Sequence, residues 1–352
     1  MGSPISAAPQ RHDYAVLLRL ADPDGLYTSV RLCSDLRLSN GRRAYARHDA
    51  EWRLELAPPR VSRLEYELEV VHRDGGTERV RDPGNPHRAP GAFGEKSVVL
   101  LPGYAAPRWL EEEGVSGRTD ELAVRGRGLG ATIHVRVWSP ADADPAEPLP
   151  LLAAHDGPEY DELAALTRFA AVAIRGDRLP RHRVALLDPG ERNEWYSASA
   201  RYAGALAFDV LPAIRAAFTA HGAPVGMGTS LGALAMLHAQ RRHPRTFGAL
   251  FLQSGSFFTP RFDAHEARFP RYQRIVRFVR EAVRDGAHPD PMPVTLTCGW
   301  AEENVQNNRL MARALSTQGY SAALHEVPDL HNYTAWRDAF EPHLTGLLAR
   351  AW

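Results

Sequence analysis

The pentapeptide Gly228-Thr229-Ser230-Leu231-Gly232 holds the residues best suited to chemistry in this chain of 352 residues. A short apolar run ends at Gly228 and a small-residue helical pattern begins at Leu231, so Ser230 is expected where a buried strand turns sharply into a helix. Glycines on both sides allow the strand and the helix to approach closely, and such a turn presents the serine hydroxyl to a cleft. The motif therefore predicts a serine nucleophile.

A serine hydroxyl needs a base to accept its proton and a third group to orient that base. His331 lies in the loop after the last predicted strand and is the expected base. Glu302 and Glu303 follow the preceding strand, and either can be the acid. We favour Glu302, because an acidic residue at position 303 is also explained by the helix dipole and Asp329 would need an unusual bend to reach His331. The order serine, acid, histidine is that of α/β-hydrolases.

An acyl-transfer intermediate also needs two N–H donors directed at its oxyanion. Leu231, directly after the nucleophile, is expected to supply the first donor. The second is expected from the loop that runs from His155 to Tyr160 after an early strand, with Gly157 as the predicted donor.

Two regions of different periodicity must position these residues. From about residue 13 to residue 101, apolar and polar residues alternate in short runs separated by turn signals, which predicts an antiparallel β-sandwich. No residue in this region has a catalytic pattern, so its expected role is structural or substrate-covering. Residues 102–127 lack periodicity and are interpreted as an interdomain connection. The predicted domains are 1–114, a small Ig-like β-sandwich, and 115–352, the catalytic α/β-hydrolase domain.

In the second region, strand and helix patterns alternate, which predicts a mostly parallel sheet with helices on both faces. The predicted strands are 131–138, 149–154, 183–187, 223–227, 247–253, 294–298 and 322–327. The predicted helices are 159–174, 200–220, one after residue 230, 272–283, 305–317 and 333–348.

The composition excludes several partners. Lys plus Arg and Asp plus Glu balance at 42 each, so neither nucleic acid nor an anionic membrane is expected to bind. Cys33 and Cys298 fall in different predicted domains, which favours a reducing compartment over a structural disulfide. Residues 1–10 lack a signal-peptide pattern, and no later run approaches a membrane span. Neither cysteine lies in a metal-ligand spacing, so no metal site is expected from them. We expect a cytoplasmic protein, and its oligomeric state cannot be read from the sequence.

Several motifs together resemble the esterase D-like serine hydrolases and, within them, the enterochelin (enterobactin) esterases. The motifs of the second region are Asp156-Gly157, Arg192-Asn193-Glu194-Trp195, Gly228 to Gly232, Gly299-Trp300-Ala301-Glu302 and the segment from His331 to Arg337. Those of the first region are Asp82-Pro83-Gly84-Asn85 and Leu101-Pro102-Gly103-Tyr104.

The resemblance implies a serine esterase without a catalytic cofactor that acts on the lactone backbone of a ferric catecholate siderophore. Asp156, Arg192 and Trp300 are the expected substrate-binding residues, and Arg192 is expected to orient the site or to meet an anionic group. Pro158 departs from the family, because relatives commonly offer an N–H at this position and proline has none. Some relatives work with a serine–histidine dyad, in which the acid is not required.

Two other functions agree with the same sequence. The β-rich first region also fits an acyltransferase, or an esterase that acts on glycan-linked acyl groups. Pro158 fits a non-catalytic ligand-binding protein that keeps the hydrolase fold. Labelling of Ser230 by a fluorophosphonate would eliminate the non-catalytic alternative.

Overall fold

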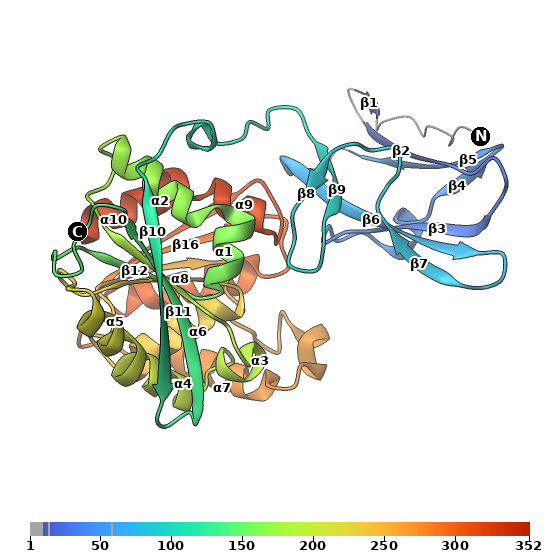
Figure 1. The fold of residues 1–352 in the computed structure, drawn as a ribbon. Coiled ribbons are helices and arrows are strands. Elements are labelled where there is room, and N and C mark those ends of the chain that lie inside the picture. The colour runs from blue at the N-terminus through green and yellow to red at the C-terminus, as the bar shows by residue number, and fades with distance from the viewer. Residues whose placement is uncertain (1–9, 13–14, 58) are drawn as a thin grey trace. The chain divides into compact units, whose positions relative to one another are not determined.

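The computed structural model describes residues 10–12, 15–57 and 59–352, drawn as a ribbon in Figure 1. Residues 1–9, on which part of the cytoplasmic prediction rests, lie outside the described residues. The chain groups into two compact units. The first runs to Ala105 and includes Trp300–Glu302 and Pro328–Thr334, and the second consists of Ala106–Gly299, Glu303–Val327 and Ala335–Trp352. The domain boundary predicted after residue 114 stays a prediction.

Within its described residues, the first unit contains two antiparallel sheets. One has the strand order β1 (Gln10–His12), β2 (Ala15–Ala21), β5 (Glu51–Leu56), β4 (Ala46–His48). The other has the order β3 (Tyr27–Cys33), β6 (Arg63–His72), β9 (Lys96–Leu100), β8 (Arg88–Ala89), with β7 (Thr77–Val80) paired to β6 and a short 3-10 turn η1 at Asn40–Arg42. Alternate residues of β2 and β5 are buried in a shared apolar core, as the period of two requires. The predicted small β-sandwich is confirmed.

The second unit is built on one eight-stranded sheet. Its order is β10 (Gly117–Gly126), β11 (Ala131–Pro140), β13 (Arg183–Leu187), β12 (Leu151–Ala154), β14 (Val225–Thr229), β15 (Ala249–Gln253), β16 (Pro293–Gly299), β17 (Ser321–Val327). The pairs β10–β11 and β11–β13 are antiparallel, and all later pairs are parallel. The carboxyl ends of β12 to β17 therefore share one edge, where ligands of open α/β sheets bind.

Helices cover both faces of this sheet, which confirms the predicted fold class. Figure 1 shows α1, α2 and α10 on one face and α4 to α7 on the other. The α-helices are α1 (Gly157–Ala164), α2 (Leu166–Arg175), α3 (Arg192–Trp195), α4 (Ala200–Ala205), α5 (Leu211–Ala217), α6 (Leu231–Arg242), α7 (Tyr272–Arg284), α8 (Val305–Thr317), α9 (Tyr333–Asp338) and α10 (Thr345–Ala351). Short 3-10 or π segments are η2 (Arg108–Leu110), η3 (Leu206–Val210), η4 (Ala264–Arg268) and η5 (Phe340–Leu344).

The segment interpreted as a connection contains a full strand, β10. The expected connection over residues 102–127 was wrong for the second half of that segment, because residues Gly117–Gly126 pair with β11 along their whole length. Most side chains of β10 are exposed or half-buried because the strand lies at the sheet edge, so the sequence carries no clear apolar alternation there.

Three predicted helices are interrupted. The helix predicted over 159–174 breaks at Ala165, whose φ of 53° is left-handed. Asp161 stabilises the new start, because its Oδ1 accepts the N–H of Thr167 at 3.1 Å. The helices predicted over 200–220 and 333–348 contain the π segments η3 and η5.

Candidate active site

Ser230 occupies a sharp turn between β14 and α6. Its φ of 54° and ψ of −121° lie outside the regions that non-glycine residues favour, as expected for a serine held in a strained turn. A Cβ at Gly228 would lie 2.6 Å from the carbonyl oxygen of Gly232, so the turn closes only with glycine there. The N–H of Ser230 donates to the Gln253 carbonyl at 2.9 Å and ties the turn to the neighbouring strand.

The hydroxyl of Ser230 lies beside a second serine. Ser256 Oγ is 3.0 Å from Ser230 Oγ, and the Ser256 N–H donates to the Ser230 carbonyl at 3.1 Å. Asn308 fixes this loop, since its side chain accepts from the N–H of Gly255 at 3.0 Å and donates to its carbonyl at 2.9 Å. Sequence reasoning missed Ser256, although its position just past the carboxyl end of β15 was a usable signal.

His331 and Glu302 form a hydrogen-bonded pair in the first unit. Glu302 Oε2 lies 2.9 Å from His331 Nδ1, and the side chains are 1% and 30% exposed respectively. A carboxylate only accepts hydrogen bonds, so Nδ1 is the donor in this pair, and in the neutral ring Nε2 is the acceptor nitrogen. Glu303 instead pairs with His265 at 2.9 Å, and Asp329 lies 3.6 Å from Arg63. The structure thus brings together the predicted acid and base, and their partnership with Ser230 stays a prediction.

Leu231 and Gly157, the predicted oxyanion donors, are the first residues of α6 and α1. N–H groups in a first helical turn have no acceptor within their own helix. A Cβ at Gly157 would lie 2.3 Å from the Leu186 Cα, so this residue must be glycine. Pro158 occupies the second helical position, where a missing N–H costs the helix nothing. Its place in the sequence therefore has a structural explanation, and the roles of the two donors stay predictions.

A buried histidine ties the Gly157 loop to the serine turn. The ring of His155 contacts the Gly232 carbonyl through Nδ1 at 3.0 Å and the Tyr202 hydroxyl through Nε2 at 2.9 Å. Burial lowers the pKa of His155 to about 4, so the ring is neutral near pH 7. A neutral ring has one N–H, which Nδ1 donates to the carbonyl while Nε2 accepts from the hydroxyl.

Comparison with known proteins now identifies the family. Residues 126–347 match the family model described as "Esterase: Putative esterase". The chain belongs to this family. This esterase is a carboxylic ester hydrolase, and its predicted resemblance to enterochelin-esterase-like proteins is confirmed. No curated protein matches its sequence.

Solved structures of similar fold cover nearly the whole esterase. The enterobactin esterase FES from Shigella flexneri in the presence of enterobactin has a TM-score of 0.74 at 20% identity, covering 99% of this chain and 96% of that chain. The ferric enterobactin esterase of Salmonella typhimurium has a TM-score of 0.72 at 21% identity, covering 96% and 93%. A ferulic acid esterase has a TM-score of 0.56 at 14% identity and covers 67% of this chain and all of that one. At these identities the likeness establishes the fold.

The three predicted substrate-binding residues differ in accessibility. Asp156 is buried, and its carboxylate accepts two hydrogen bonds from the Arg192 guanidinium, at 2.7 and 2.8 Å. The Arg192 side chain is 34% exposed and lies over the ring of Tyr196. Trp300, in the first unit of the esterase, is 45% exposed, and its indole N–H donates to the Arg60 carbonyl. Arg192 and Trp300 are accessible to a ligand, whereas the buried Asp156 carboxylate holds Arg192. The substrate-binding roles of all three residues stay predictions.

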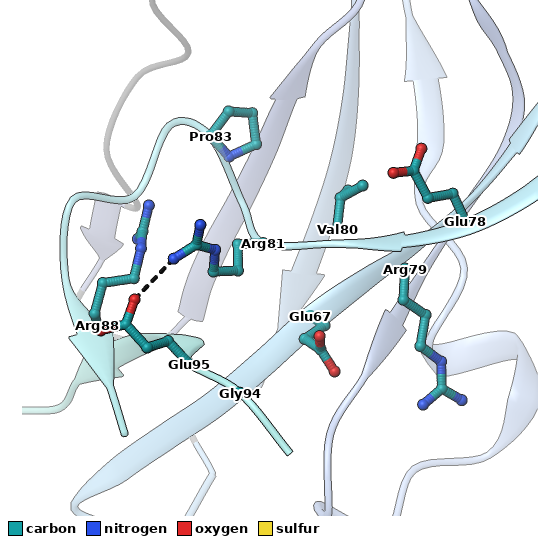
Figure 2. Close-up of a pocket in the computed structure, with 9 residues that line it drawn as sticks. All are labelled: Glu67, Glu78, Arg79, Val80, Arg81, Pro83, Arg88, Gly94 and Glu95. Atoms are coloured by element: carbon teal, nitrogen blue, oxygen red, sulfur yellow. Dashed lines mark hydrogen bonds and ion pairs between the residues drawn. The ribbon is translucent and has the colours of Figure 1, made fainter. Parts of the chain in front are cut away.

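The esterase has a large hollow that is separate from these residues. It lies on the first unit, has a volume of about 680 Å³, and is drawn in Figure 2. Its charged lining side chains are Glu67, Glu78, Arg79, Arg81, Arg88 and Glu95, of which Arg81 and Glu95 pair at 2.8 Å. None of the residues that line the hollow is a serine, cysteine or histidine, so the lining offers no hydroxyl or thiol nucleophile with a histidine base.

One group of side chains in the described part of the esterase has metal-ligand chemistry. His265, Glu266 and Glu303 offer ligand atoms that lie within 4.8 Å of one another. All three side chains are exposed or half-buried. Among the described residues, no helix combines the length and apolar character that crossing a membrane requires.

Proposed function

We propose that this carboxylic ester hydrolase is a serine esterase that works through an acyl-enzyme, with Ser230 as nucleophile, His331 as base and Glu302 as acid. The single observation that carries the proposal is the hydrogen bond from His331 Nδ1 to the buried Glu302 carboxylate. It selects the tautomer in which Nε2 accepts a proton. The strained turn at Ser230 and the shared edge of β14, β16 and β17 support the same assignment.

In the first half of the reaction, Ser230 Oγ attacks the ester carbonyl carbon while His331 Nε2 takes the hydroxyl proton. The carbonyl oxygen becomes an oxyanion, which the N–H groups of Leu231 and Gly157 stabilise. The bond to the alkoxy group breaks, His331 returns the proton to the departing oxygen, and the acyl group remains on Ser230. The buried Glu302 carboxylate stabilises the imidazolium that forms between these steps.

In the second half, water replaces the alcohol. His331 takes a proton from the water molecule, and the resulting hydroxide attacks the acyl carbon. Collapse of the second oxyanion breaks the bond to Ser230, which recovers its proton from His331. The carboxylic acid leaves and the enzyme returns to its starting state.

A catecholate trilactone siderophore of the enterobactin type is the proposed substrate. The support is a fold likeness that spans 99% of this chain to an esterase solved in the presence of enterobactin, compared with 67% for the ferulic acid esterase. The exposed face of Trp300 suits stacking with a catechol ring, and the guanidinium of Arg192 suits an anionic group. The iron belongs to the substrate in this proposal. The reducing, cytoplasmic location expected from the sequence stays part of the proposal.

The chemistry is tested with Ser230→Ala against a surface control, Ser316→Ala, using p-nitrophenyl acetate and a fluorophosphonate probe. We expect wild type and Ser316→Ala to hydrolyse the ester and to take up one probe per chain. Ser230→Ala should lose on the order of 10⁶ in kcat and all labelling. Full activity of Ser230→Ala would refute the mechanism.

The substrate class is tested by mass spectrometry of the products from ferric catecholate trilactones, aryl esters and feruloylated oligosaccharides. Rapid cleavage of the trilactone, with little turnover of the feruloyl ester, supports the siderophore assignment. The reverse preference would support an esterase that acts on glycan-linked acyl groups. The observation that favours this alternative is the fold likeness to the ferulic acid esterase.

A further inference from the structure

The loops that carry His331 and Glu302 are packed against the β-sandwich. Leu330, next to the base, is 2% exposed and belongs to the sandwich core, and Ala301, next to the acid, packs against the same core. Each catalytic side chain therefore has an immediate neighbour fixed among sandwich residues. This arrangement differs from the purely structural or covering role expected of the first region.

The segment 60–63, which leads into β6, binds both loops. The Arg60 carbonyl accepts the indole N–H of Trp300, in the loop of the acid. The Ser62 N–H donates to the Pro328 carbonyl at 2.6 Å, in the loop of the base, and the Ser62 carbonyl accepts from the N–H of Leu101 at 2.9 Å. The segment thus joins both loops to the strands of the sandwich.

Arg63 is the charged centre of these contacts. Its side chain is 3% exposed and lies 3.0 Å from Glu65 and 3.6 Å from Asp329, whose side chains are 4% and 8% exposed. The guanidinium also donates to Asn332 Oδ1 at 3.4 Å and lies over the ring of Tyr104. One buried cation therefore compensates two buried carboxylates, and removing it would leave them uncompensated.

Asp329 transmits this contact to the turn that contains the base. Its Oδ1 accepts from the Leu330 N–H at 2.8 Å and from Asn332 Nδ2 at 3.1 Å. These two residues flank His331 on either side. The carboxylate therefore spans the turn of the base with one oxygen and faces Arg63 with the other.

We propose that Arg63 is a positioning residue for catalysis, which holds the turn of His331 through Asp329 and Asn332. The proposal rests on the proposed function, because it assigns Arg63 to the base of that mechanism. Arg63 acts through the loop and touches no reacting atom. The β-sandwich is then part of the catalytic apparatus for any ester, including substrates too small to reach it.

The test uses Arg63→Lys and Asp329→Asn in the full chain, with p-nitrophenyl acetate as a small substrate. Lysine keeps the positive charge but loses the planar fork, and asparagine keeps the size of Asp329 but loses its charge. We expect kcat to fall about 10- to 100-fold, because small misplacements of a catalytic group are that costly. KM should change less than about twofold, since the binding groups stay in place.

The matched control is Asp22→Asn. Asp22 is also a buried sandwich carboxylate paired with an arginine, and it accepts hydrogen bonds from Leu26, Tyr27, Arg47 and Trp52, all within the sandwich. The Asp22→Asn variant should be less stable than wild type. Below its melting temperature, it should keep the wild-type kcat. Three results would each overturn the proposal. They are a wild-type kcat in both Arg63→Lys and Asp329→Asn, an effect of these two variants that is confined to KM, and an equal loss of kcat in Asp22→Asn.

Failure of the proposed function gives a different result. If Ser230 takes up no fluorophosphonate in the wild type and Ser230→Ala stays active, the mechanism itself is wrong. If wild type is labelled and active while Arg63→Lys and Asp329→Asn match it in kcat and in labelling rate, only the role of Arg63 is wrong. Melting curves of all variants, recorded under assay conditions, separate both outcomes from unfolding.

Discussion

Ser230 is held by atoms of its own sheet, whereas the loops that contain His331 and Glu302 are bound by segment 60–63, from the other end of the chain. The serine turn depends on the approach of Gly228 to Gly232 and on the adjacent strand β15. The turn of His331 contacts Arg63, which is 269 positions away from its partner Asn332.

The position of Ser230 is thus set by contacts within its own sheet, whereas the turn of His331 is set by contacts with residues distant in sequence. A change in the β-sandwich should leave Ser230 in its strained turn but displace His331, the proposed base. A change in the core of the large sheet should do the opposite. Three experiments test this comparison, in order of decreasing expected effect.

Replacing Glu302, the proposed acid, should have the largest effect. In Glu302→Gln, the side-chain amide no longer requires a proton on His331 Nδ1, so the tautomer that accepts the serine proton is lost in part. We expect kcat on p-nitrophenyl acetate to fall about 10³- to 10⁴-fold, as when the acid of other triads is neutralised.

Glu303→Gln is the matched control, because Glu303 pairs with His265 and its side chain is 44% exposed. It should stay within about twofold of wild type, since exposed pairs contribute little. If the kcat of Glu302→Gln also stays within about tenfold of wild type, a serine–histidine dyad suffices for catalysis. Glu302 would then have no role as the acid.

Acid should destabilise the second unit more than the first. Burial lowers the pKa of His155 and of His182 to about 4, from an ordinary 6.5. The unfolded chain therefore binds more protons between pH 6.5 and 4, and stability is lost as the pH falls through that window. At pH 5 the loss is about 2 kcal/mol for each histidine.

Two buried carboxyl groups of the first unit, Glu65 and Asp82, shift stability in the opposite direction. Burial raises the pKa of Glu65 and of Asp82, so their folded forms bind protons more readily and acid relieves a cost of burial. Native-state hydrogen exchange at pH 7 and pH 5, corrected for intrinsic rates, should show protection falling in β12 and β13 more than in β6. Equal losses in both units would contradict the contrast.

Ser256→Ala should have the smallest effect. It removes one hydrogen bond to Ser230 Oγ, and a single bond of this kind contributes about 1 kcal/mol. We expect kcat to fall about 3- to 10-fold, with probe labelling of Ser230 slowed by a similar factor. Unchanged kinetics would show that the turn alone positions the nucleophile.

Much of the second unit could be predicted from sequence because its signals are local. The alternation of strand and helix, the glycines of the serine turn and the apolar period of each buried strand all lie within short windows. Strand β13 and helix α8 begin and end where predicted, at Arg183–Leu187 and Val305–Thr317. The serine turn could be predicted for the same reason, because the residues that form it are neighbours in the sequence.

The missed features depend on partners distant in sequence. β10 is an edge strand with few buried side chains, so its pairing with β11 leaves no apolar period. The break at Ala165 has no glycine or proline to signal it and depends on the Asp161 side chain. Arg63 is one of many arginines in the sequence, and only the fold shows that it is buried beside the turn of the base.

The position of Arg63 at the start of β6 limits how this protein can be recombined. β6 pairs with β3, β7 and β9, so it is the central strand of its sheet. A chimera that exchanges residues 1–105 for those of a relative would replace segment 60–63 but keep the loops at 300–302 and 328–334. Such an exchange must transfer both loops with the sandwich, because together they form one compact unit despite their separation in the sequence.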